Sequence, residues 1–408
     1  MIGPRLKAQD EKRFGLEAYG WVSGMYFYDT RQTSSAREGL LSYYPLNQRL
    51  DANGKDINAR PNSNLNFATS RVGMRFYTPD LFGAKTAGNI EADFSGQSDP
   101  NIYVFRLRQA HITLDWERTR LLIGHTWTPF FILEMMPSVQ DLHNGGPFHP
   151  FSRNNQIRLE QMLSNSIKMQ LAAGFQRDYA SIGINGRDPF NQISSNIPEM
   201  SMFFHYKSSN WFAGLGGEYK ALKPRHSYSH LGETLVQNAL VHSYITTAFL
   251  NYKNESIDIK FQGIYGQNMN NHMMLGGFVE SIFDPVSKTF SYSPTNTASA
   301  WLDVLYPLNN YRFGLFMGYT QNLGHSAGFD VGQYYGTDKD IANVYRVAPR
   351  MEIHPSPSYF ITLQAEYTQA NYGDWQSKTG EVIDIKGIEN YRLSFAFTYK
   401  FNTPRLRY

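Results

Sequence analysis

Arginines at alternating positions are the residues of this chain best suited to chemistry. Arg71 and Arg75 alternate with Val72 and Met74. In a β-strand this spacing places both guanidinium groups on one face and the apolar side chains on the other. A guanidinium stays charged at any ordinary pH, so its chemistry is electrostatic, and a row of them beside a water-filled passage attracts anions. The arginines that we predict to face such a passage are Arg71, Arg75, Arg108, Arg120, Arg158, Arg346, Arg350 and Arg392.

Carboxylates follow the same alternation and leave two interpretations open. The acidic residues predicted to share the arginine face are Glu91, Asp93, Glu160, Glu218, Glu352 and Glu366. Pairing of Arg158 with Glu160, and of Arg350 with Glu352, would give a neutral lattice that stiffens the wall. Alternatively, a net basic face lies opposite loop acids and favours anions. Around Gln109 the alternation changes phase, which predicts either a β-bulge or an outward contact face for Arg106 and Arg108.

Other chemistries have weaker support. His143 and His149 lie near Asp141, and His272 lies among Met269, Met273 and Met274, but neither spacing matches a specific metal-ligand pattern. The sequence contains no phosphate loop, and it has no Cys. We therefore expect no enzyme activity, no cofactor and no metal. The formal net charge of +3 gives no general attraction for nucleic acid.

Strands with a period of two must position these arginines. Of the 408 residues, 15% are aromatic, and the mean hydropathy is -0.45. No apolar run approaches the roughly 20 residues that a membrane helix needs. A polar, aromatic-rich, alternating chain is typical of an all-β transmembrane antiparallel barrel, because half of each strand faces lipid. About sixteen strands are predicted, near residues 14–28, 65–78, 86–97, 103–115, 119–127, 154–163, 166–177, 198–207, 210–221, 240–252, 255–268, 297–306, 310–321, 342–354, 357–370 and 389–402.

The connectors between these strands alternate in length. Long ones are centred on 29–64, 129–153, 178–197, 222–239, 269–296, 322–341 and 371–388, and the others are short turns, including one near 96–102. Short turns on one rim and long loops on the other indicate a multi-pass protein of the outer membrane of a Gram-negative bacterium. An even strand number places both termini on the short-turn side.

The connector after the fifth strand differs from the other loops. Residues 129–153 are unusually apolar, and an exposed loop of this kind would promote aggregation. We expect it to fold into the barrel as a constriction loop, with a lid or a subunit contact as the alternative. The residues predicted to form the constriction are Trp127, Phe130, Phe131, Glu134 and Asp141.

The predicted domain organisation is simple. A short N-terminal segment over 1–12 precedes a single barrel domain over 13–402, and 403–408 form a C-terminal extension. Residues 1–11 lack an apolar signal core, so we expect this chain to be a mature form.

Five motifs in the first third carry a family resemblance. They are Tyr19–Val22 (YGWV), Thr69–Arg75 (TSRVGMR), Gly88–Phe94 (GNIEADF), Phe105–Ala110 (FRLRQA) and Leu122–Thr128 (LIGHTWT). In this order they resemble DcaP-like porins, and the likeness continues at the level of strand pattern over the rest of the chain. The resemblance implies a trimeric, sixteen-stranded channel for small anionic solutes such as dicarboxylates. It also implies that Arg71, Arg75 and Arg108 belong to a basic wall and that Trp127 marks the entry to the constriction loop.

Together these observations predict a passive diffusion porin, a homotrimer in outer-membrane lipid that passes small anionic or neutral solutes. Two other function classes stay open. An oligosaccharide-specific channel would need an aromatic track, for which Phe212, Trp301, Phe316 and Phe360 are the inward candidates. A surface adhesin or structural barrel would conduct little.

Overall fold

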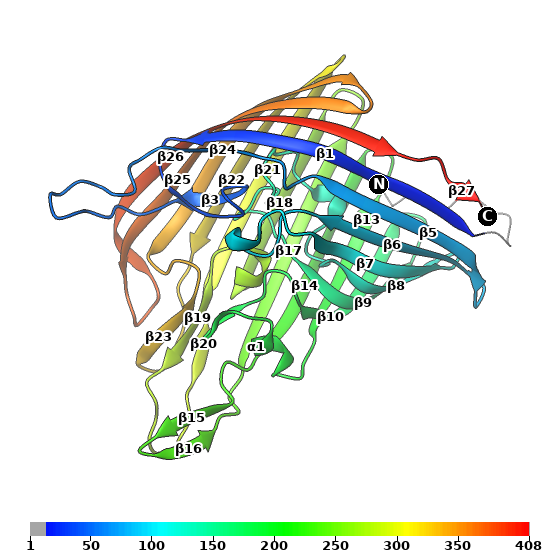
Figure 1. Ribbon diagram of the computed structural model, residues 1–408. Coiled ribbons are helices and arrows are strands. Elements are labelled where there is room, and N and C mark those ends of the chain that lie inside the picture. The colour runs from blue at the N-terminus through cyan, green and yellow to red at the C-terminus, as the bar shows by residue number, and fades with distance from the viewer. Residues whose placement is uncertain (1–13, 408) are drawn as a thin grey trace.

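The computed structural model describes residues 14–407, in which the strands close into one antiparallel barrel (Figure 1). Each long strand pairs with its neighbours in the chain, and β1 pairs with β26 from Tyr19–Asn402 to Asp29–Arg392. The prediction of sixteen spanning strands is confirmed. They are β1 (Gly15–Asp29), β5 (Arg71–Leu81), β6 (Ala84–Asp93), β7 (Arg106–Asp115), β8 (Thr119–Trp127), β9 (Arg153–Met162), β10 (Ile167–Gln176), β13 (Glu199–Lys207), β14 (Trp211–Leu222), β17 (Val241–Lys253), β18 (Asp258–Gln267), β21 (Asn296–Leu308), β22 (Tyr311–Asn322), β24 (Ile341–Ser356), β25 (Tyr359–Trp375) and β26 (Val382–Asn402).

Two short strands also pair with β1. The short strand β4 (Asn62–Asn66) pairs with the second half of β1, and β27 (Leu406–Arg407) pairs with its first two residues. Residues 403–407 thus continue along the barrel wall rather than leaving it. The N-terminal segment expected over 1–12 lies outside the described residues.

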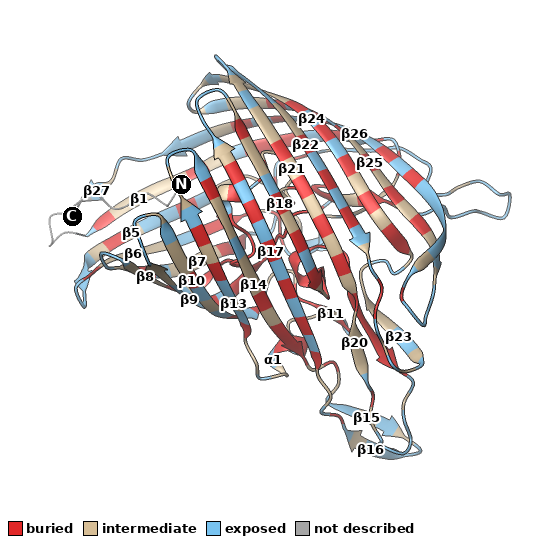
Figure 2. Cartoon of the chain, turned by 180° about the vertical axis from the view of Figure 1, so that it is seen from behind, coloured by how far each residue is buried: buried red, intermediate tan, exposed pale blue. Residues whose placement is uncertain are grey.

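Burial alternates along the strands in the opposite sense to that of a water-soluble protein (Figure 2). On β26, the outward Leu393 and Phe395 are 59% and 45% exposed, whereas the inward Arg392 and Ser394 are 1% and 5% exposed. Apolar side chains on the outside and polar ones inside are what a barrel surrounded by lipid requires. Among residues 14–407, no helix is long and apolar enough to cross a membrane.

The connectors follow the predicted alternation with two exceptions. The connector between β6 and β7, predicted as a short turn near 96–102, covers residues 94–105 and contains η1. The second exception is the connector between β25 and β26. The strand pair β25–β26 extends well beyond the neighbouring strands, from Tyr359–Tyr399 to Trp375–Val382. The long loop predicted over 371–388 is therefore wrong, since most of it is an extended hairpin with a turn over 376–381. The other long connectors contain short elements: β2 (Thr33–Ala36), β3 (Leu41–Pro45), η1 (Asp99–Asn101), η2 (Leu133–Met135), β11 (Ile182–Gly183), β12 (Gly186–Arg187), α1 (Phe190–Ile193), β15 (Ser227–His230), β16 (Glu233–Val236), η3 (Met269–His272), β19 (Gly277–Ser281), β20 (Tyr292–Pro294) and β23 (Val331–Gly336).

Candidate functional site

The loop over 128–152, between β8 and β9, crosses the lumen. The backbone N–H of Ser138 donates to Asp303 Oδ2 on β21 at 3.0 Å, and that of Gln140 donates to Gln364 Oε1 on β25 at 3.0 Å. In the strand order these strands lie on the far side of the barrel from β8. The loop consequently spans the interior and does not line the rim.

An apolar patch on the inner wall receives the apolar part of this loop. Phe130 contacts Phe203 edge to face with ring centroids 5.1 Å apart, and Phe148 lies against Phe316 at 6.2 Å. Ile132 and Met135 belong to the same buried cluster, as do Phe212 and Trp301 of the wall. The apolar loop sequence is thereby explained, because its side chains replace water against inward aromatic residues.

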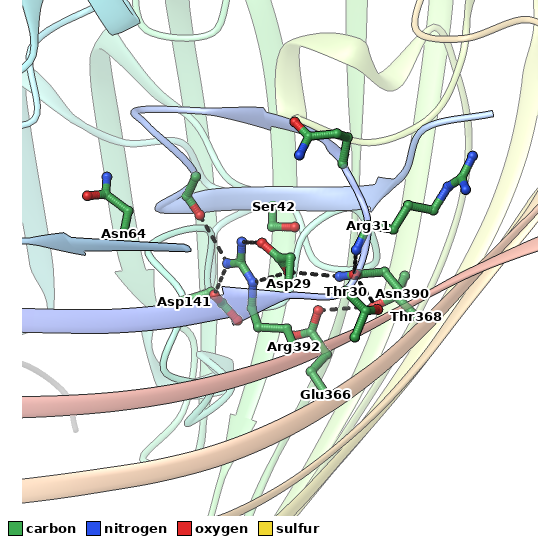
Figure 3. A network of polar contacts seen from close by, with 12 residues as sticks. Asp29, Thr30, Arg31, Ser42, Asn64, Asp141, Glu366, Thr368, Asn390 and Arg392 are labelled. Atoms are coloured by element: carbon green, nitrogen blue, oxygen red, sulfur yellow. Dashed lines mark hydrogen bonds and ion pairs between the residues drawn. The ribbon is translucent and has the colours of Figure 1, made fainter. Parts of the chain in front are cut away.

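Buried charges hold the other end of the loop (Figure 3). Arg392 on β26 donates to Asp141 Oδ1 of the loop at 3.0 Å, and to both carboxylate oxygens of Asp29 on β1 at 2.8 and 2.7 Å. Arg346 on β24 lies 3.0 Å from Glu366 and donates to the carbonyl oxygen of Gly146 at 2.9 Å. Two arginines therefore fix the loop to one wall.

This wall, formed by β24, β25 and β26 with the ends of β1 and β21, has at least as many carboxylates as arginines. Arg350 binds both oxygens of Asp303 at 2.7 and 3.2 Å, and a carboxylate oxygen of Glu352 lies 3.7 Å from Arg350 Nε. With the contacts above, Arg346, Arg350 and Arg392 each have a carboxylate partner, and all three are at most 4% exposed. These predicted pore residues act as structural ion pairs that organise the wall.

The opposite arginine group lies on β5 to β9 and is less fully matched. Asp93 accepts from Arg106 at 3.1 and 2.8 Å and from Arg108 at 2.7 Å. Glu91 accepts from Arg108 at 3.1 Å and lies 3.3 Å from Arg71. Arg153 binds Asp178 at 2.6 Å, so four arginines share three carboxylates here.

A β-bulge makes this group possible. Glu91 pairs with Gln109 but Ala92 pairs with Leu107, so β7 has one extra residue at Arg108. Arg106 and Arg108 are both buried, 5% and 1% exposed, while Leu107 between them is 50% exposed. The bulge predicted near Gln109 is confirmed, and both arginines point inward.

Trp127 and Phe131 connect this arginine group to the loop. Their rings stack with centroids 3.8 Å apart. The guanidinium carbons of Arg153 and Arg108 lie 4.7 and 5.6 Å from the centre of the Trp127 ring. Cation–π contacts of this kind hold the start of the loop beside the basic wall.

The remaining predicted residues are less constrained. Arg158 donates to Gln156 Oε1 and to the carbonyl oxygen of Trp127. Its predicted pairing with Glu160 is wrong, since Glu160 binds Lys168 on β10 at 3.2 Å. Arg120 pairs with Asp115 at 3.2 Å, and Arg75 lies 3.6 Å from Glu17 with its side chain 46% exposed. Among the described residues, Glu134 has no hydrogen-bonded or ion-paired partner for its side chain.

The histidines considered as metal ligands have other contacts. His143 lies 3.8 Å from Asp141, His149 packs against Phe131 and Trp301, and His272 is 2.8 Å from Glu218. Within the part of the chain that the structure describes, no three His, Asp or Glu residues are grouped as a metal site would require.

Sequence reasoning missed two further loops that enter the barrel. From the first loop, Tyr44 joins the buried cluster, and the backbone oxygens of Ser42 and Tyr43 accept from Arg346. From the loop over 268–295, Met269, Met274 and Leu275 join the same cluster. The available signal was local, in the short apolar runs Leu40–Leu41 and Tyr43–Tyr44 of the first loop and Met273–Leu275 of the second, which lie in loops that are otherwise polar.

Comparison with known proteins supports the fold. No protein-family model matches the sequence, and a comparison with curated proteins finds no match. The structure is similar to the outer membrane channel DcaP of Acinetobacter baumannii, with a TM-score of 0.66 and 15% identity over 95% of this chain and 97% of that one. It also resembles the outer membrane protein OmpT of Vibrio cholerae, with a TM-score of 0.57 and 9% identity over 97% and 99% of the two chains. An anion-selective porin from Comamonas acidovorans matches with a TM-score of 0.56 and 11% identity over 95% and 100%.

These similarities agree with the observed geometry in two respects, the extent of the barrel and the distribution of apolar and polar side chains. Each covers nearly the whole of both chains, so the entire barrel is matched. The lipid-facing exterior and polar interior are those of a membrane-spanning barrel. By its fold, the chain is a sixteen-stranded membrane-spanning β-barrel, and this fold is similar to that of outer-membrane channels and porins.

Proposed function

We propose that this protein is a diffusion channel through which small hydrophilic solutes cross the outer membrane. The observation that carries the proposal is the loop over 128–152, which crosses a polar interior and is fixed on both sides of it. Wide barrels are filled with water, and a fixed segment inside one limits the size of the solutes that pass.

The proposed channel has a weak preference for anions, including small dicarboxylates. Support comes from the group on β5 to β9, where Arg71, Arg106, Arg108 and Arg153 share three carboxylates. Arg158 adds a charge whose hydrogen bonds go to neutral oxygens. The matched wall around Arg350 and Arg392 adds no surplus positive charge, so the preference is small.

Single-channel recording in planar bilayers tests the proposal. In a gradient of potassium chloride, we expect a steady conductance and a reversal potential displaced toward that of chloride. Absence of ion current would contradict the channel, whereas current with a cation preference would contradict only the anion bias. Liposome swelling with anionic, neutral and cationic solutes of similar size then ranks permeation.

We further propose that the barrel assembles as a trimer. One of the similar structures, OmpT of Vibrio cholerae, is described in a trimer form. Unheated electrophoresis in SDS should give a band near three times 46.8 kDa that shifts to the monomer position on boiling. Monomer bands alone under mild conditions would contradict the assembly.

A further inference from the structure

A chamber of about 410 Å³ lies among the long loops, next to the arginine group on β5 to β9. Six loops supply its walls, and its lining includes Arg37, Tyr43, Arg177, Tyr179, Arg187 and Met273. This volume is within the range of roughly 300–1,000 Å³ that is usual for small-molecule sites.

Arg37 is a residue of the chamber whose buried guanidinium group lacks partners in the described part of the chain. It is only 5% exposed, yet its Nε and Nη1 atoms are buried and have no hydrogen-bond partner among the described residues. Over the same residues, no carboxylate lies within ion-pair distance of its guanidinium. A buried charge without a partner is unfavourable unless something else neutralises it.

The backbone around Arg37 is held in an unusual conformation. Arg37, Glu38 and Gly39 have φ values of 58°, 53° and 87°, so three consecutive residues are left-handed. A Cβ at position 39 would lie 2.3 Å from the ring of Phe27, which restricts that position to glycine. Strained backbone of this kind is retained where it positions a functional side chain.

The other charges around the chamber do not neutralise Arg37. Arg187 donates to the backbone oxygens of Ala180 and Asn270 at 2.7 and 2.8 Å, both of which are neutral acceptors. Asp178 is the one carboxylate residue in the lining of this chamber, and it is already bound by Arg153 at 2.6 Å. The chamber therefore has an excess of positive charge.

The pKa of the Tyr179 hydroxyl reflects this excess of positive charge. Burial alone would raise the pKa of its hydroxyl, but the guanidinium groups of Arg106, Arg153 and Arg37 outweigh burial and lower the pKa below its usual value. The Tyr179 oxygen is itself buried without a hydrogen-bond partner among the described residues.

One part of the remaining lining is apolar. Met274 and Leu275 are 1% and 3% exposed, and Tyr44 is 4% exposed. Tyr43 adds a second aromatic ring, whose hydroxyl donates to the Met273 sulfur at 3.7 Å. Such a surface favours a ligand with an apolar or aromatic body, because burial of that body removes it from water.

We propose that this chamber is a binding site for small organic anions that combine a carboxylate with an apolar or aromatic body. Arg37 and Arg187 bind the carboxylate, and the rings of Tyr43 and Tyr179 contact the body. The inference rests on the proposed channel function, for which it supplies a solute class and a docking point on the long-loop side.

Isothermal titration calorimetry on the purified full chain in detergent tests the site without requiring ion current. The probe is 3-phenylpropionate, compared with acetate, which lacks the aromatic body, and with 3-phenyl-1-propanol, which lacks the charge. We expect saturable binding of the probe to one site, and binding about tenfold weaker for each comparison compound.

Variants then locate the site. Arg37→Asn, which tolerates a positive φ, and Arg187→Gln should each weaken probe binding about tenfold, because each removes a charged hydrogen-bond donor. Arg60→Asn is the matched control, an exposed arginine of the same loop, and should leave binding unchanged. Should Arg37→Asn fail to fold, Arg187→Gln decides, with Arg37→Lys as a variant that keeps the charge.

Three results would overturn the site: no saturable heat with the wild-type protein, equal binding of 3-phenyl-1-propanol, or unchanged binding by both variants. If calorimetry shows no binding but the conductance is normal, the binding site is contradicted and the channel function stands. If binding is saturable but no conductance is seen, the channel function is contradicted and the binding site stands.

Discussion

The two arginine groups of the lumen use the same residue type for different purposes. On β24 to β26, Arg346, Arg350 and Arg392 are nearly inaccessible and each has a carboxylate partner, so their charges are cancelled locally and fix the inserted loop. On β5 to β9, four arginines share three carboxylates, and Arg158 has neutral acceptors. Only charge that is not cancelled nearby acts on a passing ion. Under the proposed channel function, the first group therefore fixes the structure of the pore, and the second sets its preference for anions.

The largest effect is expected from Arg392→Gln, which breaks the first group. The change leaves Asp29 and Asp141 buried without their main partner, and loss of one member of a buried ion pair costs about 3–5 kcal/mol. We expect a lower unfolding temperature by circular dichroism in detergent, and a larger and noisier unit conductance as the loop detaches.

The matched control for this change is Arg312→Gln. Arg312 lies on β22 with its side chain 47% exposed, 4.0 Å from Glu352, so its loss should cost less than about 1 kcal/mol. Equal decreases in unfolding temperature for the two substitutions would contradict the idea that the buried Arg392 ion pairs stabilise the barrel more than the exposed pair of Arg312 with Glu352.

A smaller effect, on selectivity, is expected from Arg71→Gln combined with Arg75→Gln in the second group. Each substitution removes a positive charge, whose interaction with an ion at roughly 8 Å in water is about 0.5 kcal/mol and about half that after screening by roughly 0.1 M salt. Because the interaction has opposite signs for an anion and a cation, the anion-to-cation permeability ratio should fall about fivefold. The reversal potential in a salt gradient measures it.

The combination of Arg350→Gln with Asp303→Asn tests whether the arginine group on β24 to β26 affects ion selectivity. This pair of changes removes one positive and one negative charge from the matched wall, so the reversal potential should stay where it is in the wild-type protein. A shift as large as that of the Arg71 and Arg75 double variant would mean that both groups set selectivity.

Among the variants expected to change selectivity, Arg158→Gln should have the smallest effect. It removes a single charge that has no carboxylate partner within ion-pair distance among the described residues, and should change the permeability ratio about twofold in the cationic direction. An unchanged reversal potential would show that Arg158 lies away from the ion path.

The barrel itself could be predicted because it depends on local signals. Alternation with a period of two and the alternating connector lengths gave the strand number and the bulge near Gln109. The hairpin that replaces the loop over 371–388 was missed because its strands continue as far as Trp375–Val382, through residues that favour turns such as Asn371, Gly373 and Asp374.

Most of the ion pairing could not be predicted, because most partners come from distant parts of the chain; the predicted Arg350–Glu352 pair, at 3.7 Å, is the exception among the predicted Arg158–Glu160 and Arg350–Glu352 pairs. Arg392 binds Asp29 and Asp141, which lie 363 and 251 positions away. Glu160 was paired with Arg158 two residues earlier on one strand, but residues at that spacing are about 6.6 Å apart along the strand. Lys168 on the adjacent strand reaches Glu160 at 3.2 Å instead.

The contact between Arg392 and Asp29 has a consequence for assembly. Arg392 belongs to the last long strand and Asp29 to the first, and the same guanidinium holds Asp141 of the inserted loop. The complete arrangement of Arg392, Asp29 and Asp141 therefore exists only after β1 has paired with β26. In a folding intermediate with an open barrel the inserted loop lacks this attachment, so closure of the barrel and final placement of the loop occur together.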